Sequence, residues 1–383
     1  MNNKTPRAYQ GFTLVEFMVA SVLGLVVIAA VGGLYSYNRK LGDIANKRSQ
    51  VQQELRTAAE MFTRDARMAG SFGCVSLGRK TAPDVPGTVD FTVHTTAPQP
   101  NSGFAHLKPI GTGSAGASVD SFGVRIWAKS SISAAHIPVL DTGDKFTADS
   151  DAIAFYYGLG DVVPETGVAT GANFNKPAHG NYAVQQAFDN KEYLVATDCN
   201  KLELLLPAAK GATTISSTHI PDGTLTSLNQ TNLMKYVAVA YMVGFVGPDK
   251  ATAKTNGTYG LYRMELGEEG KWTAPQMLAK SVTGIETIRF AHIPDCPDPS
   301  INAEGPANQY TVLMGGDATY RPGGTAKEVP PSAVTMVLKY DYDTLTHSGA
   351  RDIATGGKNN EFYITANIRT GGYCANRRLE PTP

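Results

Sequence analysis

The first seventy residues carry two hydrophobic patterns, one after the other. From Phe17 to Tyr37 the chain has 21 consecutive uncharged, mostly apolar residues, which is about the length that crosses a hydrocarbon core of about 30 Å. After Tyr37 the apolar residues recur at spacings of three, four and seven, which predicts an amphipathic helix with one apolar stripe. The members of this stripe are Ile44, Val51, Leu55, Ala58, Phe62, Ala66 and Ala69.

Together the two patterns predict one helix from residue 12 to about residue 69. At a rise of about 1.5 Å per residue, such a helix is about 87 Å long. Gly70 is expected to end it. A dimeric coiled coil is an alternative for the stripe, but a helix lying on a sheet fits the spacing equally well. Charged side chains are expected on the other helix faces: Arg48, Glu54, Arg56, Glu60, Arg64 and Asp65.

After Gly70 the pattern changes to short apolar runs bounded by Gly, Pro, Asn and Asp, which predicts strands. We expect one antiparallel, β-rich domain of about 314 residues that rests on the second half of the helix, and no second long helix. Surface loops are expected at 79–121, 158–190 and 301–331. The expected strands are Val124–Ala128, Ala152–Tyr157, Tyr193–Thr197, Leu202–Leu206, Tyr236–Val246, Leu261–Leu266, Ile285–Ala291, Ala333–Tyr340 and Phe362–Arg369.

The charge is balanced overall but segregated along the chain. The 34 basic and 34 acidic side chains cancel, which argues against nucleic acid as a partner because nucleic-acid-binding domains carry a basic excess. Residues 1–11 have a net charge of +2, and residues 38–69 have +3. Glu16 contributes −1, and residues 70–383 have a net charge of −4. An acidic body therefore follows a basic neck.

Glu16 is the one ionisable residue between Phe12 and Tyr37. A carboxylate buried deeply in a membrane costs about 2.5 to 3.5 kcal/mol on insertion scales. Glu16 therefore either reaches the membrane interface or needs a partner charge, which a new N-terminus just upstream would supply. A secretory signal peptide is disfavoured, because the apolar run is too long and no small-x-small cleavage site follows it.

The segment Gly11-Phe12-Thr13-Leu14-Val15-Glu16, after a short basic leader, resembles the processing site of type IV prepilins and related pseudopilins. The resemblance implies that prepilin peptidase cuts after Gly11 and that Phe12 becomes the N-methylated mature N-terminus. It also implies that Glu16 neutralises the Phe12 amine of a neighbouring subunit in a helix bundle. Such a chain resides in the inner membrane, with its body in the periplasm, before it enters a filament on the cell surface.

Major pilins are much shorter than this chain, so its size points to a minor subunit, and the chain looks like the PilW-type minor pilins. Their relative in type II secretion is the J-type pseudopilin. The implied fold is α+β and pilin-like, with a leader (1–11), a transmembrane or filament-core half-helix (12–37), an amphipathic half-helix (38–69) and a body (70–383). The similar segments are AGSFGCV, SDAIAFYYG, LVATDC, VAVAYMVGF, GLYRMEL, SVTGIETIRF and FYITANIRTGGYC.

Four cysteines, Cys74, Cys199, Cys296 and Cys374, lie in the body without a CxxC pair. On the non-cytoplasmic side disulfides persist, and four cysteines allow three connectivities. We favour Cys74 with Cys199 and Cys296 with Cys374, because each pair then lies within one half of the domain. The basic neck weakens the positive-inside argument for this orientation, which therefore depends on the resemblance.

The sequence contains no catalytic or metal-binding pattern that fits its context. The seven histidines lack HxH and HExxH spacing, and neither GxSxG nor GxxxxGK[ST] occurs. The GxGxxG match at 111–116 lacks the preceding strand and following helix that a dinucleotide site needs. No catalytic residue, metal or cofactor is expected, and the chain is not expected to be an enzyme.

The resemblance implies a structural protein that primes assembly of a type IV pilus, is incorporated at or near its tip, and supports adhesion and twitching motility. Its partners would be prepilin peptidase, the major pilin and other minor pilins through the N-terminal helix, and a tip adhesin. A tip-exposed ligand-binding module is one alternative, which would require exposed aromatics such as Tyr156, Tyr157 or Tyr310 in one patch. A J-type pseudopilin of type II secretion is the other.

Overall fold

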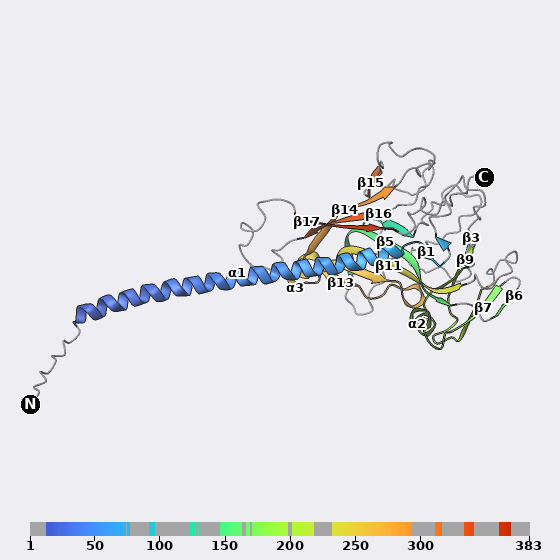
Figure 1. Cartoon of the computed structure of the whole chain (residues 1–383), viewed down its shortest axis with the longest axis horizontal. Helices are drawn as coiled ribbons and strands as arrows, with labels where there is room; N and C mark the ends of the chain where they lie inside the picture. Colours follow the sequence, from blue (N-terminus) through green and yellow to red (C-terminus); the bar gives the residue numbers. More distant parts are fainter. Residues whose placement is uncertain are drawn as a thin grey trace, which may run out of the picture.

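The chain is seen in a computed structural model as one long helix that extends out of a β-rich body (Figure 1). This α+β arrangement is the predicted fold class. The structure describes residues 13–73, 75–76, 92–95, 123–127, 129, 146–162, 166–168, 171–197, 201–217, 232–292, 311–315, 333–340 and 360–368.

Helix α1 spans Leu14–Met68, 55 residues without a break. Thr13 caps its N-terminus, and Ala69 is the C-terminal cap. Gly70 follows with a φ of 72°, a left-handed conformation that glycine adopts without strain. The predicted single helix and its stop at Gly70 are therefore confirmed, with each end of the helix within two residues of the expected position.

The largest sheet has eight strands built around β11, Asn232–Val246. One edge of β11 pairs with β5, and the other pairs with β8 along its first part and with β12 along its second part. The strand pairs of this eight-stranded sheet are antiparallel except for β3 with β9, which is parallel. This parallel pair corrects the expectation of a purely antiparallel body. The other strands are β3 (Thr92–Thr95), β4 (Val124–Trp127), β5 (Phe146–Val162), β8 (Leu194–Thr197), β9 (Lys201–Leu205), β12 (Tyr259–Glu265) and β13 (Gln276–Ala279).

A second, four-stranded sheet has the order β15-β14-β16-β17 and is antiparallel throughout. Its strands are β14 (Val282–His292), β15 (Thr311–Gly315), β16 (Ala333–Tyr340) and β17 (Glu361–Asn367). Two smaller sheets have the orders β10-β7-β6 and β1-β2. Their strands are β1 (Ser71–Phe72), β2 (Val75–Ser76), β6 (Thr166–Val168), β7 (Gly171–Asn175) and β10 (Thr214–Ser217).

Strand β11 separates two apolar cores because successive side chains of a strand point to opposite faces. Val239, Tyr241 and Val243 face the core that contains the stripe of α1. Ala240 and Met242 face a second core, which includes Trp272. Helix α1 packs on β5, β13 and β17, so its second half covers both the large sheet and the four-stranded sheet.

The nine predicted strands all occur, with ends shifted by up to six residues. The predicted loops are wrong in part: 158–190 contains the end of β5, β6, β7 and helix α2 (Tyr182–Asn190), while 79–121 contains β3 and 301–331 contains β15. These elements were missed because they are short. Helix α2 has nine residues and α3 (Lys250–Asn256) has seven, too few for a long apolar periodicity.

Candidate functional site

The start of α1 is closed by a reciprocal pair of hydrogen bonds between Thr13 and Glu16. The backbone N–H of Thr13 donates to Glu16 Oε2 at 3.0 Å, and the backbone N–H of Glu16 donates to Thr13 Oγ1 at 3.3 Å. The Thr13 hydroxyl also donates to Glu16 Oε2, at 2.9 Å. This capping box satisfies N–H groups that a helix start leaves without intrahelical partners.

The capping box could have been read from the sequence, because Thr13 and Glu16 have the spacing of its [ST]-x-x-[EQ] pattern. It places the Glu16 carboxylate against the backbone N–H and the hydroxyl of Thr13. Gly11 and Phe12 themselves lie outside the described residues, so cleavage after Gly11 and methylation of Phe12 remain predictions. The same holds for the charge partnership of Glu16 with a neighbouring subunit.

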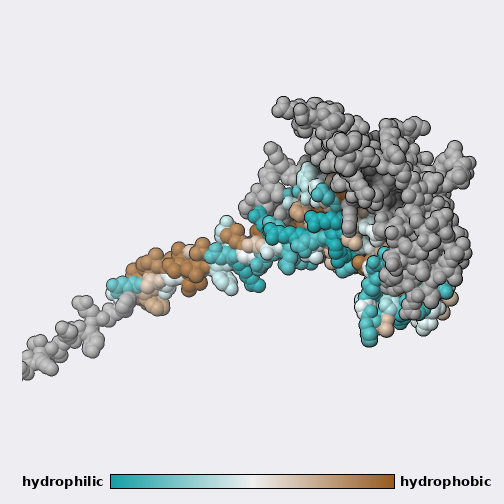
Figure 2. All heavy atoms as spheres, turned by 45° about the vertical axis from the view of Figure 1, so that its right-hand side comes forward, coloured by the Kyte–Doolittle hydropathy of each residue, from teal (hydrophilic) through white to brown (hydrophobic). Residues whose placement is uncertain are grey.

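The described residues of the body do not cover the first half of α1. Its large apolar side chains from Leu14 to Leu41 are between 41% and 76% exposed. In Figure 2 they form a continuous hydrophobic rod outside the body. The helix is long and apolar enough to cross a membrane. A bare apolar rod of this size requires a second apolar environment, such as a bilayer or a bundle of other helices.

The second half of α1 is covered by the body along the predicted stripe. Six of the seven stripe residues, Val51 to Ala69, are at most 2% exposed, whereas Ile44 is only half-buried. Phe62 lies edge-on to Phe155 and to Tyr241, with ring centroids 5.1 and 5.3 Å apart. The stripe is therefore a helix-on-sheet contact within this chain, which decides against the coiled-coil alternative.

A buried polar cluster lies near the C-terminal end of this stripe. Asp65, in the last turn of α1, is fully buried. Its Oδ1 accepts a hydrogen bond from the Tyr157 hydroxyl at 2.9 Å. Its Oδ2 accepts one from the Tyr241 hydroxyl at 2.6 Å and one from Arg263 Nε at 2.9 Å. The Asp65 cluster (Asp65, Tyr157, Tyr241 and Arg263) thus joins the helix to β5, β11 and β12.

Electrostatics explains the composition of the Asp65 cluster. A carboxylate near a helix C-terminus is disfavoured by the helix dipole, and its burial adds a desolvation penalty, so it needs strong donors. Burial, followed by the charge of Asp65, raises the pKa of both Tyr157 and Tyr241 above the usual tyrosine value, which keeps the two hydroxyls protonated as donors. Despite its burial, Arg263 has a raised pKa because of Asp65.

The Asp65 cluster fixes the position of α1 along its own axis. A slide of the helix by one turn, about 5.4 Å, would put Lys47 and Glu54 on the sheet in one direction and would put Phe62 at the position of Ala58 in the other. It would also put Met61 or Ala69 in the place of Asp65. Neither side chain could accept the three hydrogen bonds, and Arg263 would keep only Glu265 as an ion-pair partner. The Asp65 cluster and the apolar stripe therefore favour the same single register of the helix on the sheet.

Ion pairs continue from the Asp65 cluster across the sheet. Arg263 Nη1 donates to Glu265 Oε2 at 3.2 Å, and Lys235 Nζ lies 3.5 Å from Glu265 and 2.7 Å from Glu192. The side chains of Lys235 and Glu192 are only 6% and 10% exposed. Positive and negative groups alternate along this row, so each buried charge has an opposite neighbour.

Two sequence-based expectations are wrong in and around the Asp65 cluster. Asp65 was expected on an outer face of the helix because carboxylates are usually exposed, but it faces the core, as its spacing of three from Phe62 and four from Ala69 allows. Tyr156 and Tyr157 were named as candidates for an exposed aromatic patch, but they are 2% and 5% exposed. Tyr310, the third candidate, lies outside the described residues. So do Cys74, Cys199, Cys296 and Cys374, and their pairing stays a prediction.

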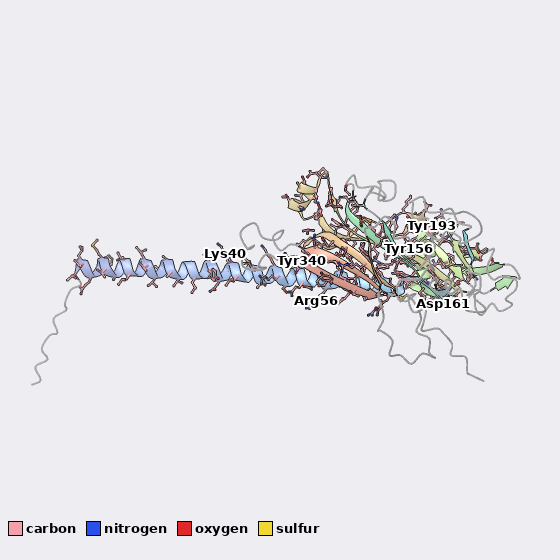
Figure 3. The ribbon with its side chains drawn as sticks, turned by 90° about the horizontal axis from the view of Figure 1, so that it is seen from above. Lys40, Arg56, Tyr156, Asp161, Tyr193 and Tyr340 are labelled. Carbon is pink, nitrogen blue, oxygen red and sulfur yellow. The ribbon has the colours of Figure 1, made fainter. Side chains whose placement is uncertain are left out.

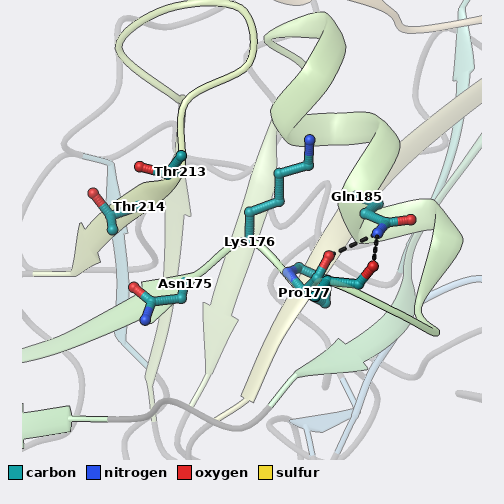
Figure 4. Close-up of a pocket in the computed structure, with 7 residues that line it drawn as sticks. Asn175, Lys176, Pro177, Gln185, Thr213 and Thr214 are labelled. Carbon is teal, nitrogen blue, oxygen red and sulfur yellow. Dashed lines mark hydrogen bonds between the residues drawn. The ribbon is translucent and has the colours of Figure 1, made fainter.

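A shallow depression on the body lies between β7, α2 and β10 (Figure 4). Its lining includes Lys176 and Gln185, and both already have partners within the chain. Gln185 Nε2 donates to the carbonyls of Pro177 and Ala178, at 2.7 and 2.9 Å, and Lys176 pairs with Asp189. Among the described residues there is also no group of three His, Cys, Asp or Glu side chains that could hold a metal ion.

Comparison with known proteins gives one match, at the N-terminus. The model of the prokaryotic N-terminal methylation motif matches residues 6–32, which include Gly11, Phe12 and Glu16. No curated protein and no solved structure matches the chain. The motif is a structural signal rather than that of an enzyme. The motif is typical of type IV pilin-like and pseudopilin chains, and it implies processing by prepilin peptidase and association with pilin assemblies.

Proposed function

We propose that this type IV pilin-like chain is a minor pilin that helps to prime a type IV pilus and is incorporated at or near its tip. The observation that carries the proposal is the division of α1 into two halves. The second half packs against the body of its own chain, so its apolar stripe is not available to other subunits. The first half is apolar on every side and open to the bilayer or to the helices of other subunits.

The size of the body favours a minor subunit over a major one. About 314 residues follow α1, many more than the resemblance implies for a major pilin. A subunit repeated along the whole filament would have to accommodate this bulk at every step, whereas a subunit at or near the tip would not. The segments similar to PilW-type chains support the same assignment. The proposal includes the favoured disulfides, Cys74 with Cys199 and Cys296 with Cys374, which would stabilise a body located in the periplasm.

The proposed partners differ before and during assembly. Before assembly the subunit lies in the inner membrane, where prepilin peptidase removes residues 1–11 and methylates Phe12. During assembly the first half of α1 packs against the major pilin and other minor pilins. There Glu16 neutralises the Phe12 amine of a neighbour, because an unpaired charge in an apolar bundle is costly. No catalytic step is proposed for the subunit itself.

A deletion strain tests the proposal by two parallel counts, surface pili and type II secretion of an exported enzyme. The minor-pilin function predicts few or no pili, a loss of twitching motility and normal secretion, all restored by the wild-type chain. Normal pili with lost secretion would instead identify a J-type pseudopilin. A chain that lacks 301–331 tests the remaining alternative, since normal pili with lost adhesion would identify a ligand-binding module at the tip.

A further inference from the structure

The surface of α1 changes character abruptly between Tyr37 and Leu41. Up to Tyr37 the exposed side chains are apolar, with Tyr35 at 69% and Tyr37 at 56% exposed. Arg39 and Lys40 follow at once, and both are exposed. Figure 3 shows Lys40 on the part of α1 that lies outside the body, whereas Arg56 lies beside it. The two cations therefore stand next to the apolar rod and away from the described part of the body.

The length of the apolar rod places these residues at a membrane surface. The 21 residues from Phe17 to Tyr37 span about 31 Å as a helix, which equals the thickness of a hydrocarbon core. When Glu16 is at one interface, Tyr35 and Tyr37 are therefore at the other, where tyrosine is enriched in membrane proteins. Arg39 and Lys40 lie about 3 to 5 Å further along the axis, at the level of the lipid phosphates.

The two cations form no charge contact with the part of the chain that the structure describes. Neither Arg39 nor Lys40 forms an ion pair with a described residue, and the first fully buried stripe residue, Val51, lies eleven residues beyond Lys40. That separation is about 16 Å along the helix. The body, with its net charge of −4, would be repelled by an anionic surface, so a basic spacer between the two is favourable.

We propose that, before assembly, Arg39 and Lys40 bind the phosphate groups of anionic lipids in the leaflet that faces the body, and that this contact sets the depth of α1 in the membrane. The two cations stand on the side that the positive-inside bias disfavours, and headgroup binding gives them a role there. Each cation near such a surface is worth about a fivefold preference for anionic over neutral lipid, so the pair gives about 30-fold at low salt. The proposal goes beyond the minor-pilin function, because it applies equally to a pilus or a pseudopilus subunit.

The test is a competition between two populations of vesicles of different density. One contains phosphatidylcholine alone, and the other contains phosphatidylcholine with phosphatidylglycerol. The full chain, with Lys4→Gln and Arg7→Gln in every sample to remove the leader charges, is reconstituted into the mixture from mild detergent. The vesicles are then separated by flotation, and the protein per lipid is measured in each. The variants are Arg39→Gln/Lys40→Gln, Arg39→Lys/Lys40→Arg and Arg56→Gln/Arg67→Gln.

The reference chain and the charge-preserving variant should prefer phosphatidylglycerol vesicles by about 30-fold at low salt, and less as salt is added. Arg39→Gln/Lys40→Gln should lose most of this preference. Arg56→Gln/Arg67→Gln removes the same charge from exposed positions at least about 24 Å beyond Lys40, so it should keep the preference. An even distribution of the reference chain, or an equal loss in both Gln variants, would overturn the proposal. Neither outcome depends on whether the chain enters a pilus.

Discussion

The Asp65 carboxylate in the last turn of α1 accepts a hydrogen bond from Arg263 Nε on β12 at 2.9 Å, and the Asp65 side chain is fully buried. Residues 198 positions apart in the chain thereby form one ion pair inside the core. The pair joins the helix that we assign to membrane and filament to the sheet that carries the body.

Replacement of Asp65 by Ala should destabilise the body strongly. The change removes the shared acceptor of Tyr157, Tyr241 and Arg263 and leaves Arg263 with only Glu265 as an ion-pair partner, which should cost about 3 kcal/mol. Urea unfolding of the full chain in mild detergent, followed by near-ultraviolet circular dichroism, measures the loss. Asp43→Ala on the exposed part of α1 is the control and should change the free energy of unfolding by about 0.5 kcal/mol or less. An unchanged unfolding midpoint for Asp65→Ala would contradict the assigned role of the Asp65 cluster.

Gly123→Ala should destabilise the chain by more than a backbone effect alone. Gly123 has a φ of +78°, and a Cβ there would lie 2.0 Å from the backbone nitrogen of Gly70, directly after α1. Gly180 is a matched control, because its φ is +72° and a Cβ there would meet nothing within 4 Å. Gly180→Ala should cost about 1 kcal/mol, and Gly123→Ala clearly more. Equal losses in thermal unfolding would show that the close approach to Gly70 is unimportant.

The stability of the body should fall in acid partly through Asp149. Burial tends to raise the pKa of Asp149, but Lys129, Lys250 and Tyr259 bring it down to about 2. The unfolded pKa is about 3.9, so the ionised form stabilises the fold above about pH 4, and this contribution is lost as the pH falls towards 2. Asp149→Asn should therefore flatten the pH dependence of the free energy of unfolding between about pH 4 and 2. An identical slope in wild type and variant would disprove the contribution.

Glu16→Gln should separate the two roles of this residue. Glutamine can keep the capping box with Thr13 but carries no charge. If the carboxylate neutralises the Phe12 amine of a neighbour, Glu16→Gln and Glu16→Ala should both reduce pilus number in a deletion strain, while the leader is still removed. Thr13→Ala, which weakens only the cap, should leave most pili intact. Normal piliation with Glu16→Gln would mean that hydrogen bonding is sufficient.

The sequence predicted the elements of this fold better than their contacts. The 3.6-residue period identified the stripe around Leu55 and Phe62, and β-branched and aromatic runs identified strands such as β11. Asp65 was missed because its donors, Tyr157, Tyr241 and Arg263, come from three distant strands. No local pattern brings such residues together, and the charge of Asp65 suggested exposure even though its spacing from Phe62 fits the stripe. The Thr13–Glu16 capping box, by contrast, was readable from sequence spacing alone.

The most direct test of the account is mass spectrometry of the N-terminal peptide of this chain from sheared pili. The mature chain should begin at Phe12, and its N-terminal peptide should be one methyl group heavier than the unmodified peptide. Cells without prepilin peptidase should retain residues 1–11 and yield no such peptide. A chain in the pilus fraction that still carries its leader, or one cut after the apolar run near Tyr37, would contradict the account.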